Sequence, residues 1–207
     1  MPRTYSPEAL SPSDALERLR EGNRRFVNGQ GAAVGTWRPG LVDGQWPFAT
    51  ILGCSDSRTP AEYVFDQGLG DLFVIRVAGN IVAPSLVGSI EFAASQFGTR
   101  LVVVMGHTHC GAVETTVRSL THDDTPEASR NVRSIVDRIA PHLEDLCRTP
   151  MDHARRMTEA VRVNAVASAH EVPTTSELLQ GLVASGRVRI VPAVLDLATG
   201  VVSFHED

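Results

Sequence analysis

The chain has 207 residues and a formal net charge of −5, and all 19 of its basic residues are arginine. Without lysine it cannot form a lysine Schiff base, which excludes pyridoxal-phosphate and lysine-aldolase mechanisms. It also cannot form the glycine-rich phosphate loop that requires lysine before serine or threonine. The acidic balance argues against a nucleic-acid partner, because nucleic-acid binding depends on neutralising phosphates.

The cysteines are Cys54, Cys110 and Cys147. A small odd number in a chain of this length does not indicate a secreted disulfide framework; it favours free thiols or metal thiolates in a reducing compartment. No apolar run approaches the roughly 20 residues of a membrane span, and the first ten residues lack the apolar stretch of a signal peptide. We therefore expect a cytoplasmic protein with no membrane partner.

The first expected element is an amphipathic helix at residues 13–28, capped by Ser13 or Asp14, with Leu16 and Leu19 on its apolar face. Residues 29–44 are rich in glycine and turn residues and are expected to form a loop.

Short apolar runs then alternate with helical stretches. Residues 48–52, 72–77 and 101–105 have the pattern of strands that are buried on both faces. The intervening stretches 60–65 and 84–97 have helical character. This alternation is typical of a parallel α/β sheet.

The last third of the chain predicts helices followed by a hairpin. Helices are expected at residues 132–147, 157–165 and 176–184, and the two strands of the hairpin at residues 188–195 and 201–204. No repeat or linker divides the chain. We expect one α/β domain over residues 1–207, with a mostly parallel sheet flanked by helices; its parts are an N-terminal arm (1–44), a core (45–120) and C-terminal helices and strands (121–207).

Two motifs each follow a predicted strand directly: Gly53-Cys54-Ser55-Asp56-Ser57-Arg58 and Gly106-His107-Thr108-His109-Cys110-Gly111. Residues just past the carboxyl ends of parallel strands line the functional crevice of such a sheet, so these motifs can meet. Two thiolates and one imidazole form a zinc-binding set, and three protein ligands leave the fourth position open, as in catalytic sites. We expect one zinc per chain, bound within residues 45–120.

The alternative is that Cys54 and Cys110 are buried core thiols, which is common for free cysteine. The flanking glycines, the nearby histidine and the Asp–Arg pair favour the metal. His109 is adjacent to Cys110, and adjacent side chains project in different directions. His107, three residues from Cys110 at the expected opening of a helix, is therefore assigned as the ligand, with His109 as a neighbour of the site.

Two nucleophilic mechanisms can be compared with the same motifs. A cysteine-dependent phosphatase needs arginine six positions after its cysteine, but these positions hold Pro60 and Thr116. Ser55 and Ser57 lack the Gly-x-Ser-x-Gly elbow of an acyl-transfer serine. The zinc interpretation is therefore preferred.

Asp56 and Arg58 lie two residues apart on the first motif, and alone they would indicate a solvated or structural ion pair. Beside a metal, Asp56 either completes the zinc tetrahedron or is held off it by bidentate pairing with Arg58. In the second case water takes the fourth position, and zinc lowers the pKa of that water towards neutrality.

Cys-Ser-Asp-Ser-Arg followed about fifty residues later by Gly-His-x-x-Cys-Gly resembles the β-class carbonic anhydrases. The resemblance extends over most of the chain, through the pattern at Leu16 to Phe26 and the stretches 70–76, 88–92 and 183–204. It implies zinc held by Cys54, His107 and Cys110, and a zinc-bound hydroxide that attacks carbon dioxide to give bicarbonate. It also implies that Asp56 orients the hydroxide while Arg58 keeps Asp56 off the metal; in closed members the equivalent of Asp56 is itself the fourth ligand.

The resemblance also implies a substrate pocket and an assembly. Gln45 matches a substrate-binding glutamine contributed across a dimer interface. Phe73 and Ala78 match apolar pocket positions, and Phe92 stands where plant-type members carry tyrosine. The family forms homodimers or dimers of dimers, with the N-terminal helix embracing the partner.

Two alternatives for the function remain open. Relatives with the same ligands hydrolyse carbonyl sulfide or carbon disulfide, and the metal motifs do not separate these substrates from carbon dioxide. The second alternative is a non-catalytic zinc-binding module in which Asp56 occupies the fourth zinc position. Cys147 is expected to be a packed core thiol, and the five histidines outside the second motif are expected at the surface.

Overall fold

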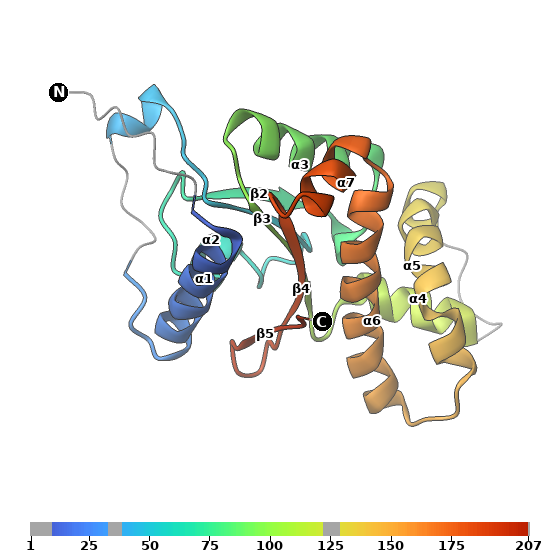
Figure 1. Ribbon diagram of the computed structural model, residues 1–207. Helices are drawn as coiled ribbons and strands as arrows, with labels where there is room; N and C mark the ends of the chain where they lie inside the picture. Colours follow the sequence, from blue (N-terminus) through green and yellow to red (C-terminus); the bar gives the residue numbers. More distant parts are fainter. Residues whose placement is uncertain (1–9, 33–38, 122–128, 207) are drawn as a thin grey trace.

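A five-stranded sheet forms the centre of the structure, a computed structural model that describes residues 10–32, 39–121 and 129–206 (Figure 1). The spatial order of the strands is β2-β1-β3-β4-β5. The first four strands run parallel, and β5 pairs antiparallel with β4. The strands are β1 (Ala49–Gly53), β2 (Leu72–Arg76), β3 (Leu101–His107), β4 (Arg189–Leu195) and β5 (Val202–Phe204).

Helices cover both faces of this sheet (Figure 1). Side chains of α1 and α2 pack in one core with β1, β3 and β4. Those of α3, α6 and α7 pack in a second core against the opposite face, and a third core joins α4, α5 and α6. The helices are α1 (Pro12–Val27), α2 (Ala61–Val64), α3 (Pro84–Gln96), α4 (Gly111–Thr121), α5 (Arg130–Arg148), α6 (His153–Thr174) and α7 (Glu177–Ala184).

Burial on both faces explains the apolar runs. Every residue of β1 and β3 is buried, and successive side chains enter opposite cores: Ile51 lies in the core under α1, and Leu52 lies in the core under α3. On β3, a Cβ at Gly106 would lie 3.4 Å from Val161 and Ala165 of α6. The absence of a side chain at Gly106 therefore lets α6 pack directly on the end of the central strand.

The expected single α/β domain with a mostly parallel sheet is confirmed, and most element ends agree within one or two residues. Four details were wrong. The helix expected at 157–165 is much longer and forms α6 over His153–Thr174. Ser11, rather than Ser13 or Asp14, caps α1 by accepting a hydrogen bond from the backbone N–H of Asp14, with Pro12 in the first turn. The strand β3 continues through His107, and the loop expected at 29–44 contains a 3₁₀ helix at Pro39–Asp43.

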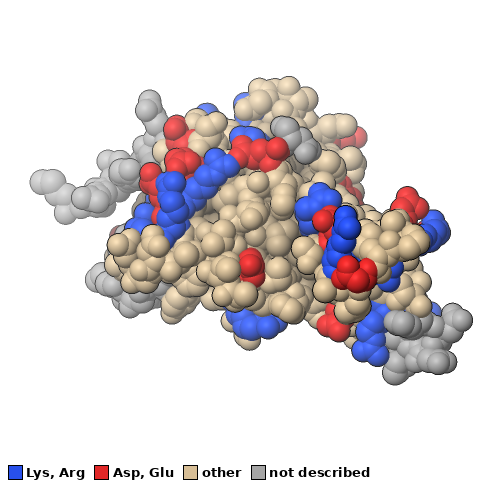
Figure 2. Space-filling view, turned by 90° about the horizontal axis from the view of Figure 1, so that it is seen from below, with Lys and Arg blue, Asp and Glu red and all other residues tan. Residues whose placement is uncertain are grey.

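Parts of the expected N-terminal arm, residues 1–9 and 33–38, lie outside the described residues. Within the described ranges, no helix combines the length and the hydrophobicity that crossing a membrane requires. On the face drawn in Figure 2, arginines lie beside acidic side chains. Such pairs also occur within one helix: in α1, Glu17 pairs with Arg24 at 2.8 Å and with Arg20 at 3.8 Å.

Candidate metal centre

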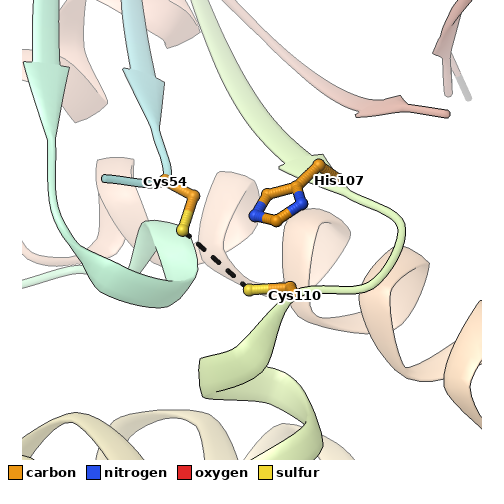
Figure 3. A group of neighbouring side chains, drawn as sticks. All are labelled: Cys54, His107 and Cys110. Carbon is orange, nitrogen blue, oxygen red and sulfur yellow. Dashed lines mark hydrogen bonds between the residues drawn. The ribbon is translucent and has the colours of Figure 1, made fainter. Parts of the chain in front are cut away.

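The two motifs meet at the carboxyl ends of β1 and β3 (Figure 3). Cys54 follows β1 directly, His107 is the last residue of β3, and Cys110 immediately precedes α4. β1 lies between β2 and β3, so the chain leaves β1 towards one neighbour and later returns to the other. The connections diverge at this point, which is where open α/β sheets form their binding crevices.

The expected ligand atoms form a tight, buried group. The Sγ atoms of Cys54 and Cys110 are 3.9 Å apart, and all three candidate ligand atoms lie within 4.8 Å of one another. Two sulfurs each about 2.3 Å from a tetrahedral zinc stand roughly 3.8 Å apart. The observed separation therefore fits a shared zinc ion. The side chains of Cys54, His107 and Cys110 are only 5%, 1% and 1% exposed.

The ring of His107 is oriented for metal binding. Its Nδ1 lies 2.9 Å from the carbonyl oxygen of Thr108, and because a carbonyl only accepts, Nδ1 carries the hydrogen. The neutral ring then presents a lone pair at Nε2, which is buried and has no hydrogen-bond partner among the described residues. A buried acceptor of this kind is costly unless something binds it, and a metal ion satisfies it.

Hydrogen bonds to the end of β4 and to the residues after it fix the backbone of Thr108, next to this ring. The Thr108 N–H donates to the Leu195 carbonyl at 2.9 Å, and its hydroxyl accepts from the N–H of Leu197. His109 follows with a φ of +57°, which reverses the chain so that Cys110 faces the ring. The expectation that His107 and Cys110 share the opening of a helix was therefore wrong: His107 ends a strand, and a tight turn brings Cys110 to it.

The two thiols have opposite tendencies to ionise. The hydrogen bond from Cys110 lowers the pKa of Cys54 to about 4 against the effect of burial, with help from His107 and the N–H of Gly79. The resulting Cys54 thiolate raises the pKa of Cys110, and burial adds to this. Burial works against a charge on His107, but the neighbouring Cys54 and the Thr108 carbonyl raise the pKa of its ring. Cys54 is thus the ligand that ionises most readily, and its thiolate stands beside the other two candidate ligands.

Asp56 and Arg58 form a bidentate pair beside this group. The guanidinium donates from Nε to Asp56 Oδ1 at 2.9 Å and from its terminal nitrogen to Oδ2 at 2.7 Å, and the Arg58 N–H also donates to Oδ1. These hydrogen bonds hold the pKa of the Asp56 carboxyl well below its usual range. Asp56 Oδ2 lies 4.0 Å from Nε2 of His107. Of the two arrangements expected from the sequence, this geometry is the one in which Arg58 engages the carboxylate.

Two residues that were not among the predicted site residues hold this turn in place. Arg76, at the end of β2, donates to the carbonyl oxygens of Cys54 (3.0 Å) and Asp56. The hydroxyl of Thr59 donates to the same Asp56 carbonyl at 3.0 Å. The position of Arg76 at the carboxyl end of an adjacent strand was the available signal, because side chains there point to the same edge of the sheet.

The expected pocket residues lie in two places. The rings of Phe73 and Phe92 contact each other and Phe97, with centroids 5.7–6.3 Å apart. Gln45 lines a surface hollow of about 470 Å³ together with Phe97 and Gly70. Ala78 instead lies beside Gly79, whose N–H points at Cys54 Sγ from 3.4 Å. Within this chain, Gln45, Phe73 and Phe92 thus gather around Phe97, and only Ala78 adjoins the metal ligands.

The remaining candidates have mixed outcomes. Cys147 packs at the edge of the core formed by α4, α5 and α6, as expected. Of the five histidines expected at the surface, His122 lies outside the described residues. His142 was wrongly placed there: its side chain is only 18% exposed and its Nδ1 lies 3.4 Å from Oδ1 of the buried Asn164.

Comparison with known proteins identifies the family. Residues 49–202 match the family model described as carbonic anhydrase. A protein named carbonic anhydrase from Mycolicibacterium smegmatis is 38% identical over 198 residues, 94% of each chain. Carbonic anhydrase 2 of Mycobacterium tuberculosis is 35% identical over 92% of this chain and 91% of its own.

The fold agrees with these sequence relationships. A structure described among tetrameric β-carbonic anhydrases from the filamentous ascomycete Sordaria macrospora superposes with a TM-score of 0.71 at 20% identity, covering 94% of this chain and 98% of that one. The chain belongs to the β-class carbonic anhydrase family.

Proposed function

We propose that this protein catalyses the reversible hydration of carbon dioxide to bicarbonate and a proton, with one zinc per chain held by Cys54, His107 and Cys110. One arrangement carries the proposal: an ionised carboxylate, Asp56, is clamped by Arg58 beside a buried Cys-His-Cys set whose histidine has a bare nitrogen. A purely structural zinc site has four protein ligands, whereas this set supplies three.

Each residue has a proposed task in the reaction. When bound, zinc acts as a Lewis acid that lets water serve as a nucleophile near neutral pH. Asp56 accepts a hydrogen bond from that nucleophile and orients it towards the carbon of the substrate. Arg58 occupies both carboxylate oxygens of Asp56, which keeps the carboxylate ionised and away from the metal position.

We further propose that the substrate pocket is completed in a cytoplasmic homodimer or dimer of dimers. Phe92 is 53% exposed although its ring packs on Phe73 and Phe97, which suits a surface that a second chain covers. In this assembly Gln45, Phe73 and Phe92 line the pocket together with Ala78, and Gln45 reaches the metal site of the partner chain.

Zinc content and hydration rate measured on the same preparation test the activity. We expect one zinc per chain and stopped-flow carbon dioxide hydration that increases between pH 7 and about 9, as water at a catalytic zinc ionises. Fully loaded protein without hydration activity would refute the proposal. Sulfide release from carbonyl sulfide, assayed alongside, identifies a hydrolase if it proceeds while carbon dioxide hydration is absent.

Mixed dimers test the shared pocket. Gln45→Ala and Asp56→Asn each inactivate a homodimer if Gln45 serves the partner's site. In a heterodimer of the two variants, both substitutions then fall in one site and the other site is intact. Activity recovered on mixing the two inactive proteins supports a shared site, whereas activity no greater than the two variants give separately contradicts it.

A further inference from the structure

A buried asparagine on α6 is connected to the metal ligand Cys54 through a single residue. The Nδ2 of Asn164 donates to the carbonyl oxygen of Gly79 at 2.9 Å. The N–H of the same Gly79 donates to Cys54 Sγ at 3.4 Å. Asn164 is 1% exposed, and the core around it on α6 includes Ala160 and Val161. The two hydrogen bonds thus meet at Gly79, on the two peptide groups that flank its Cα atom.

Gly79 needs such an anchor. Its φ of +72° is in the left-handed region, which glycine adopts readily because it has no Cβ. A side chain is also excluded, because a Cβ would lie 2.7 Å from Ile139 Cδ1 and 3.1 Å from the Ala112 Cβ. The carbonyl that Asn164 binds belongs to the peptide after the one whose N–H donates to Cys54, and only the φ and ψ torsions of Gly79 separate the two. By fixing the second peptide, the Asn164 amide limits these torsions and so helps to set the direction of the Gly79 N–H.

The side chain of Asn164 is itself fixed by a contact with α5. Its Oδ1 lies 3.4 Å from Nδ1 of His142 on α5, and the other ring nitrogen of His142 lies 3.6 Å from Glu171 of α6. The amide cannot rotate without losing a contact on each side. A buried amide in an apolar core costs stability unless it is bonded, so its place here calls for a partner such as the Gly79 carbonyl.

We propose that Asn164 is a positioning residue for the zinc site: it orients Gly79 so that its N–H donates to the Cys54 sulfur, which moderates the donor strength of that sulfur and preorganises it for the metal. The inference rests on the proposed zinc site and adds a residue more than 50 positions away from any ligand in sequence. Residues that orient metal ligands in this way typically contribute 10- to 100-fold to metal affinity.

The test uses Asn164→Leu, which removes the amide while keeping the branched shape of the side chain, in the full-length protein. Zinc affinity is measured by competition with a chromophoric chelator. The thiolate-to-cobalt charge-transfer band of the Co²⁺-substituted protein reports on the sulfur itself. We expect zinc binding to weaken roughly tenfold, and the band to move to longer wavelength because a sulfur that loses a hydrogen bond is easier to oxidise.

Ser168→Ala is the matched control. Ser168 lies one turn further along α6, is fully buried, and its hydroxyl has no hydrogen-bond partner among the described residues. It should leave both the affinity and the band unchanged. If Asn164→Leu does not fold, Asn164→Ala is measured in its place, because alanine favours a helix and also removes the donor.

The outcomes separate the inference from the proposal on which it rests. A folded Asn164 variant with wild-type affinity and an unshifted band overturns the role of Asn164 and leaves the zinc site intact. Equal shifts in Ser168→Ala also overturn it, since they would reflect general perturbation of α6. A wild-type protein that gives no thiolate–cobalt band overturns the zinc site and this inference together.

Discussion

Replacing Gly22 by alanine is expected to destabilise the protein strongly, although alanine is the better helix former. Gly22 lies in α1, and a Cβ there would stand 1.7 Å from the carbonyl oxygen of Phe65 and 2.8 Å from Nε2 of Gln67. Phe65 is fully buried at the end of α2. The clash is with backbone, so α1 and the segment after α2 have to move apart by roughly 1.5 Å or more to restore ordinary contact.

The expected loss of stability can be worked out from the hydrogen bonds that this movement breaks. The adjacent Asn23 donates to the carbonyls of Val64 (3.1 Å) and Gly200 (2.9 Å) and accepts from the N–H of Val202 (3.0 Å). Three largely buried hydrogen bonds contribute about 1 kcal/mol each, and overpacking adds about 1–3 kcal/mol. The helix propensity of alanine offsets about 1 kcal/mol of this. The net loss of about 3–5 kcal/mol corresponds to a decrease in Tm of roughly 10 °C for a chain of this size.

The chain contains a control with the opposite expected sign. Gly181 lies in α7, is exposed, and a Cβ there would have no atom within 4 Å apart from its chain neighbours and the backbone of its own helix. Gly181→Ala should therefore stabilise the protein by about 0.5–1 kcal/mol. Urea unfolding followed by circular dichroism, at one protein concentration for all three proteins, measures both changes. A Gly22→Ala protein within about 0.5 kcal/mol of wild type would refute the close approach of α1 to Phe65.

Three further predictions concern the site. Asp56→Asn should keep zinc, because three ligands remain, yet lower the hydration rate by about two orders of magnitude or more; stopped-flow assays with metal analysis measure both. Cys110→Ser should lose zinc and Cys147→Ser should retain it, and equal zinc content in the two proteins would contradict the ligand assignment. Because Arg58 depresses the pKa of Asp56, their pairing should stabilise the folded state fully above pH about 4 and progressively less as the pH falls below that. The stability difference between wild type and Arg58→Gln, measured by urea unfolding of zinc-free protein, should therefore decrease between pH 6 and 3; a constant difference would argue against it.

The sheet could be predicted because its strands are covered on both faces. A strand such as β3, buried at every position, leaves a continuous apolar run in the sequence, and the motif residues begin where the run ends. Since parallel strands end at one edge, Cys54 and His107 had to lie near each other if their strands were neighbours. The sequence did not establish that β1 and β3 are adjacent; the pairing of Gly53 with Met105 in the structure supplies that step.

The detailed geometry of the ligands depends on contacts that leave no periodic pattern. His107 was expected on a helix because a spacing of three suits one, but the backbone N–H of Thr108 donates to Leu195 of β4, almost 90 positions later in the sequence. The left-handed conformation of His109 then makes the turn. A hydrogen bond between segments so distant in sequence cannot be inferred from the spacing of residues within one motif.

Residues that support the site from a distance are hard to recognise because they bind backbone carbonyls, which every residue possesses. Arg76 and Asn164 both act in this way, on Cys54 and Gly79. Yet one rule would have selected Asn164. It lies on the buried face of α6 with Val161 and Ala165, and a buried amide must find a donor and an acceptor. A buried amide, with both a donor and an acceptor to satisfy, therefore indicates an unseen partner more strongly than a single hydroxyl such as that of Ser168 does. In a sheet whose strand ends carry metal ligands, the loops beside those ligands are the first place to look for that partner.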